Sequence, residues 1–128
     1  MVKEVSKSSV IVYIKKAEEF YAIALEALEN KRYDAATFNA TQAVILANDA
    51  LCINFLGRRP SKDHREAVNL HLQVGKQIAD TSKRQTVISI FDERSESGYT
   101  ERMIKPFEAR KSVIQAKQFI EWAKEKIG

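Results

Sequence analysis

Arginine, tyrosine and histidine side chains are the groups of this sequence that could act on a phosphate or a nucleotide. Arg94 follows Phe91 by three residues and Val87 by seven, so it extends the apolar face of a helix. A guanidinium in that position requires a carboxylate, a carbonyl or a phosphate as its partner. Tyr99 stands five residues later. Two interpretations stay open: an arginine that ties two helices together, or an anion-binding site centred on Arg94 and Tyr99.

The two histidines and the single cysteine predict no metal site. His64 and His71 are seven positions apart, which is about 10 Å along one helix and too far for both to bind one ion. Cys52 lies in an apolar run, where a buried hydrophobic residue is expected. The chain has no glycine-rich phosphate loop and no nucleophile paired with a nearby base. We therefore expect no metal and no cofactor, and His71 is expected to be a packed, hydrogen-bonded residue.

The basic charge of the chain lies mostly in its middle. Residues 58–111 carry twelve Lys and Arg against eight Asp and Glu, whereas residues 1–57 carry six against seven. Arg58, Arg59 and Lys62 stand in a predicted loop before a helix that starts near His64, and these four residues are candidate phosphate contacts. The alternative interpretation is that these charges are solvated on the surface of the loop and contact no phosphate. Few aromatic residues interleave with the basic ones, so base stacking is not indicated.

Helical periodicity accounts for almost the whole chain. Apolar residues at spacings of three and four predict helices over 10–30, 33–56, 63–78 and 106–127, with a shorter helix beginning near residue 81. Residues 95–105 are polar and are expected to form a loop. Alanines at 36, 40, 43, 47 and 50 let a neighbouring helix approach closely, and this second helix is apolar over most of its girth. It therefore lies centrally or is shared with a second copy of the chain.

These elements predict an all-α fold, an up-down antiparallel bundle of four to five helices in one domain over residues 1–128. No segment approaches the roughly 20 apolar residues that a membrane-spanning helix needs. The amino-terminal apolar run from Val10 to Ile14 has no small-residue cleavage site after it. A cytoplasmic protein without membrane contact is therefore expected.

The order and spacing of several short motifs resemble the HEPN superfamily. The resemblance extends from about residue 9 to residue 127. It rests on Asp34-Ala35-Ala36, Phe55-Leu56-Gly57, Pro60 with His64, Phe91-Asp92-Glu93-Arg94 with Tyr99, and Phe119-Ile120-Glu121-Trp122.

The resemblance implies a helical bundle that pairs into a homodimer and works beside a minimal nucleotidyltransferase in toxin–antitoxin or defence systems. Active members are metal-independent ribonucleases with an Arg-x4–6-His motif after the fourth helix. Here Arg94 matches the arginine, but Tyr99 stands at the position of the histidine, and a phenol with a pKa near ~10 is a poor general base at neutral pH.

The resemblance therefore favours a homodimeric module that binds a nucleotide, RNA or a nucleotidyltransferase partner without strong catalysis. One alternative is an endoribonuclease that uses Arg94 with Tyr99 or with His64. A second alternative is a purely structural helical adaptor.

Overall fold

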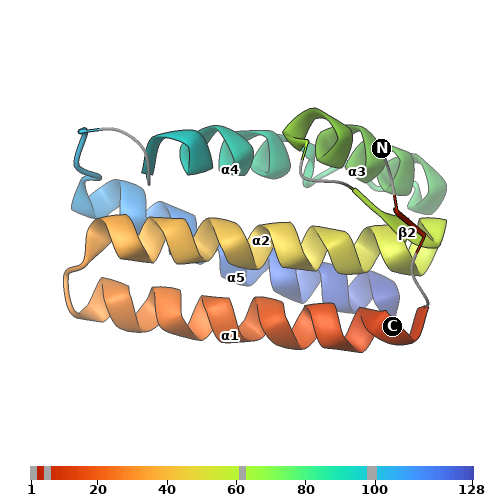
Figure 1. Ribbon diagram of the computed structural model, residues 1–128, viewed down its shortest axis with the longest axis horizontal. Helices are drawn as coiled ribbons and strands as arrows, with labels where there is room; N and C mark the ends of the chain where they lie inside the picture. Colours follow the sequence, from red (N-terminus) through yellow and green to blue (C-terminus); the bar gives the residue numbers. More distant parts are fainter. Residues whose placement is uncertain (1–2, 5–6, 61–62, 98–100) are drawn as a thin grey trace.

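The computed structural model describes residues 3–4, 7–60, 63–97 and 101–128, with side chains over 8–60, 63–91 and 101–128. Five helices dominate the described chain (Figure 1). They are α1 (Val10–Glu29), α2 (Tyr33–Leu56), α3 (His64–Ile78), α4 (Arg84–Ser97) and α5 (Pro106–Ile127). The predicted all-α bundle is confirmed.

Helices α1 and α2 form an antiparallel hairpin whose turn closes over three residues. The backbone N–H of Arg32 donates to the carbonyl of Ala27 at 2.8 Å, and Lys31 adopts a positive φ of 60°. Alanines line the contact, with Ala17 and Ala24 on α1 and Ala40 on α2 fully buried. Small side chains permit the close approach of the two helix backbones, as the alanine spacing predicts.

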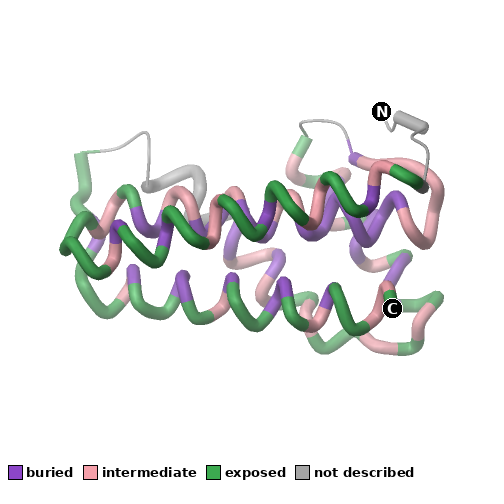
Figure 2. The backbone as a smooth tube through the Cα atoms, turned by 90° about the horizontal axis from the view of Figure 1, so that it is seen from below, coloured by how far each residue is buried: buried purple, intermediate pink, exposed green. Residues whose placement is uncertain are grey.

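Helix α2 is the central element of the bundle. It contacts every other helix, and thirteen of its residues are buried, whereas Ala35 near its start is exposed. Figure 2 shows the buried residues gathered on the surfaces where the helices meet. The central position that its apolar surface predicted is therefore confirmed, and a second copy of the chain stays a prediction. Because the other helices of the same chain cover most of α2, its apolar surface is not separate evidence for a homodimer.

Two short features differ from the sequence-based prediction. Arg58–Arg59 form strand β2, which pairs antiparallel with β1 (Lys3–Glu4), where a loop was expected. Strands of two residues are too short to show an alternating pattern, and the partner strand is more than fifty residues away. The predicted loop over 95–105 was also wrong at its start, because α4 continues to Ser97. Serine and glutamate are tolerated in a last helical turn, so polarity alone did not locate its end.

The remaining helix boundaries follow local chemistry. Gly57 ends α2 with a left-handed φ of 72°. Asp63 caps α3, since its side chain accepts the backbone N–H of Arg65 at 2.9 Å. Pro106 is the first residue of α5, as predicted. No helix in the described ranges is long and apolar enough to cross a membrane.

Candidate functional site

His64 begins α3 and lies directly against α4. Its imidazole ring stacks on the ring of Phe91, with centroids 4.8 Å apart and planes inclined by 35°. The Asp63 cap fixes the first turn of α3, and therefore the position from which the histidine projects. The contact brings an imidazole, a side chain that can donate or accept a hydrogen bond, beside the second half of α4.

Arg94 lies on α4 three residues beyond Phe91, which is about 4.5 Å farther along the helix axis. The side chain of Arg94 and the whole of Tyr99 lie outside the described residues. The backbone thus brings His64 close to the helical turn that carries Arg94. The predicted roles of Arg94 and Tyr99 remain predictions.

Arg58 and Arg59 occupy neighbouring positions of β2 and point to different elements. Arg58 Nη2 donates to Gln73 Oε1 of α3 at 3.4 Å. The guanidinium of Arg59 lies over the ring of Tyr13 in α1, 5.6 Å from its centroid. Successive side chains of a strand point to opposite faces, so the two arginines diverge and do not form one clamp. Lys62 lies outside the described residues.

The candidate residues therefore fall into two groups. Figure 1 shows β2 near the end of the bundle that carries both chain termini, whereas α4 ends beside the start of α5 at the opposite end. Arg58 and Arg59 belong to the first end, and Arg94 lies on the last turns of α4. His64 is the candidate that contacts α4 directly.

Asp49 is a charged residue that the sequence analysis missed. It lies on α2, is 8% exposed, and is followed by four apolar residues that are fully buried, Ala50 to Ile53. Burial raises the pKa of its carboxyl to about 7, and the positive charge of Arg59 partly opposes that shift. A carboxylate within the alanine-rich and apolar second half of the helix was the available signal. Asp49 therefore adds a group that titrates near neutral pH at the β2 end of the bundle.

His71 has a structural role, as predicted. Its Nδ1 is 3.0 Å from Asn48 Oδ1, and its ring packs beside Phe119 and Trp122, which also contact each other. The residue is 1% exposed. Burial lowers the pKa of His71 to about 4 despite the nearby charge of Asp80, so the ring is neutral at physiological pH. A neutral ring that hydrogen bonds to Asn48 holds α3 against α2.

Cys52 is fully buried, in agreement with the prediction, and burial raises the pKa of its thiol. A buried thiol with a raised pKa is a poor nucleophile. Among the residues with described positions, no group of three or more His, Cys, Asp or Glu could hold a metal ion.

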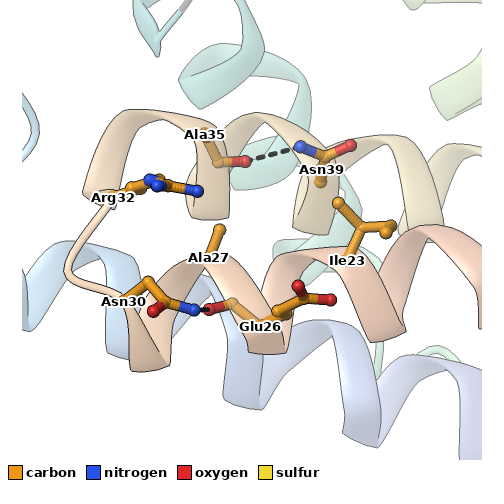
Figure 3. A pocket seen from close by; sticks show the side chains of 7 residues that line it. All are labelled: Ile23, Glu26, Ala27, Asn30, Arg32, Ala35 and Asn39. Carbon is orange, nitrogen blue, oxygen red and sulfur yellow. Dashed lines mark hydrogen bonds between the residues drawn. The ribbon is translucent and has the colours of Figure 1, made fainter.

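A shallow hollow lies between α1 and α2 near their turn (Figure 3). Its volume is about 180 Å³, below the roughly 300–1,000 Å³ of ordinary small-molecule sites. The amides of Asn30 and Asn39 donate to carbonyls of their own helices, at 2.9 and 2.8 Å. None of the predicted site residues lines this hollow, which is formed by Ile23, Glu26, Ala27, Asn30, Arg32, Ala35 and Asn39.

The HEPN domain family model matches residues 11–127, which span all five helices. A search of curated proteins found no match. HEPN domains are generally linked to nucleotide or RNA binding or to ribonuclease activity, and they often dimerise. Because the match covers nearly the whole bundle, this chain belongs to the HEPN domain family.

Proposed function

We propose that this protein is a single-domain HEPN module that binds a nucleotide or RNA as a homodimer and has little ribonuclease activity. The observation that carries the proposal is the contact between His64 and Phe91, one turn before Arg94 on α4. A site near these residues could present an imidazole and a guanidinium to one phosphate. Arg58 and Arg59 would add favourable charge at the other end of the bundle.

The weak catalysis follows from proton-transfer chemistry. Tyr99 stands where active family members have a histidine, and loss of a placed general acid or base costs about 10²–10⁴-fold in rate. A phenol replaces a histidine at neutral pH only when its pKa is strongly lowered by nearby positive charge and exclusion of water.

The second candidate function is a metal-independent endoribonuclease that uses Arg94 with His64, or with Tyr99. The contact of His64 with Phe91 favours His64 for that role, because the ring lies close to the turn of α4 that carries Arg94. His64 would act as the general acid or base, and Arg94 would stabilise the charge that develops on the phosphate.

We also propose a biological setting for the module. A minimal nucleotidyltransferase in a toxin–antitoxin or defence-type system is the partner that the family resemblance favours. Co-expression with a nucleotidyltransferase encoded beside this chain, followed by size-exclusion chromatography, tests that pairing. A separate elution of the two proteins would contradict it.

A cleavage assay separates the binding module from the ribonuclease. Labelled single-stranded RNA is incubated with the wild type, Arg94→Ala, His64→Ala and Tyr99→Phe in EDTA between pH 5 and pH 9. We expect wild-type protein to bind RNA and to leave it intact over several hours. Cleavage that Arg94→Ala abolishes would establish the ribonuclease instead, and loss in either His64→Ala or Tyr99→Phe would identify the proton carrier. Absence of RNA and nucleotide binding would favour the structural adaptor.

A further inference from the structure

The outward face of α5 carries an aromatic residue, an aliphatic residue and three cations in one row. Arg110, Lys111 and Ile114 follow Phe107 by three, four and seven positions, and Lys117 follows Ile114 by three, so the five residues share one side of the helix. All five are exposed, Phe107 by 60% and Ile114 by 55%. We call this row the α5 stripe.

The α5 stripe is displayed by a firmly packed helix. The opposite side of α5 is buried against α2 and α1, with Ala109, Val113 and Ala116 at most 3% exposed. Just before the helix, Ile104 is buried and its backbone N–H donates to Asp34 Oδ2 of α2 at 3.2 Å. The N–H of Lys105 donates to Glu108 Oε1 at 2.9 Å. Phe107 is therefore held outward by a helix whose first turn is fixed.

The charge of the stripe favours an anionic occupant. Glu108 is the one carboxylate between Phe107 and Lys117, and it is engaged by Arg102 and by the N–H of Lys105. Arg110 and Lys111 thus face solvent within four positions of Phe107, and Lys117 follows Ile114 by three. The next carboxylate of the helix, the exposed Glu121, lies four positions beyond Lys117, at the far end of the stripe. The scarcity of aromatic residues among the basic ones did not indicate base stacking, but the exposure of Phe107 beside cations does. An exposed aromatic ring next to a row of cations has the chemistry of single-stranded nucleic acid binding, in which bases stack on the ring and phosphates contact the cations.

We propose that the α5 stripe binds single-stranded RNA, with one base stacked on Phe107 and phosphates held by Arg110, Lys111 and Lys117. The proposal rests on the RNA-binding function proposed above and identifies the surface that performs it. Figure 1 shows α5 starting at the end of the bundle where α4 ends. A strand bound along the stripe would therefore lead toward the turn of α4 that carries Arg94.

The test compares two oligomers that carry the same phosphate charge. Fluorescence anisotropy measures the affinity of a labelled adenosine decamer and of an abasic decamer for the wild type, Phe107→Ala and Phe107→Trp. The matched control is Ile23→Ala, which truncates a 51% exposed residue of α1. Circular dichroism verifies that each variant is folded.

Phe107→Ala should weaken binding of the adenosine decamer by roughly 5- to 150-fold, the usual effect of losing one stacked base. Phe107→Trp should restore it, and Ile23→Ala should not change it. The abasic decamer should bind wild type and Phe107→Ala equally. The slope of log K against log salt should stay the same in Phe107→Ala, because no cation is removed.

Three results would overturn the proposal. If wild type binds the decamer and Phe107→Ala binds it equally well, the stripe is not the RNA surface, although the proposed function stands. If Phe107→Ala converts a dimer into a monomer in sedimentation equilibrium and weakens both decamers equally, this face is an interface between two copies. If wild type binds neither decamer, the proposed RNA binding fails together with the stripe.

Discussion

Replacement of Asp49 by asparagine should stabilise the protein at neutral pH and have little effect in acid. The carboxyl is 8% exposed, and burial raises its pKa from 3.8 to about 7. Between these two values the folded state binds more protons than the unfolded state, so Asp49 lowers stability as the pH rises. Asparagine has a similar shape and no charge, and it removes this pH-dependent cost.

The magnitude follows from the pKa shift. At about 1.4 kcal/mol per pKa unit, ionisation of Asp49 should cost on the order of 3 kcal/mol between pH 4 and pH 7. The free energy of unfolding of Asp49→Asn minus that of the wild type should increase by this amount over the same range. Any cost of burying the amide is independent of pH, so it cancels in that increase.

The stability of Asp49→Asn must be compared with that of the wild type at each pH, because His71 changes the stability of both proteins with pH in the opposite direction to Asp49. The pKa of His71 is lowered from 6.5 to about 4, so the unfolded state binds more protons in this window and stability rises with pH, by about 3 kcal/mol. The two buried groups therefore nearly compensate in the wild type. A flat pH profile of the wild type alone would hide both effects.

Urea unfolding followed by the fluorescence of Trp122, at half-unit steps from pH 4 to pH 8, provides the free energies. Asp80→Asn is the control of opposite sign, because hydrogen bonds from Ser82, Trp122 and Lys126 hold the pKa of Asp80 well below its usual range. That variant should be destabilised by an amount that stays nearly constant from pH 4 to pH 8, because the contribution of a carboxyl with a lowered pKa is lost only below the unfolded value of 3.8. A difference between Asp49→Asn and wild type that does not change with pH would refute the reasoning, as would a carboxyl titration of Asp49 near 4 by NMR.

Three further outcomes are expected. Gly57→Ala should lower the free energy of unfolding by about 1 kcal/mol, because the φ of 72° is strained for alanine and no atom lies within 4 Å of the added methyl group. Urea denaturation measures this loss, and an unchanged midpoint would contradict it. Replacing Arg58, Arg59 and Lys62 together by glutamine should flatten the salt dependence of RNA affinity, measured by anisotropy at two salt concentrations. An unchanged slope would assign these residues to the protein's own packing. Sedimentation equilibrium at micromolar concentration should give twice the chain mass of 14.6 kDa, and a concentration-independent monomer would exclude the homodimer.

Asp49 and Phe107 show why part of the candidate site could not be predicted. Both residue types are visible in the sequence, but their importance depends on exposure, which is decided by the neighbours of each helix. Asp49 is unusual because its neighbours on the second half of α2 are buried, so its carboxylate is removed from water. Phe107 is unusual for the opposite reason, since its side of α5 has no neighbour within the described chain that covers it.

The sequence by itself determined the helices, the alanine contact between α1 and α2, and the structural role of His71. These features follow from a period of 3.6 residues, from caps such as Asp63 and Gly57, and from side-chain size, all of which act over a few neighbouring positions. Tertiary structure alone decided that β1 pairs with β2, that Arg58 and Arg59 diverge, and that His64 meets Phe91. Each of these contacts joins residues far apart in the chain, and local periodicity carries no information about which distant surfaces meet when the core closes.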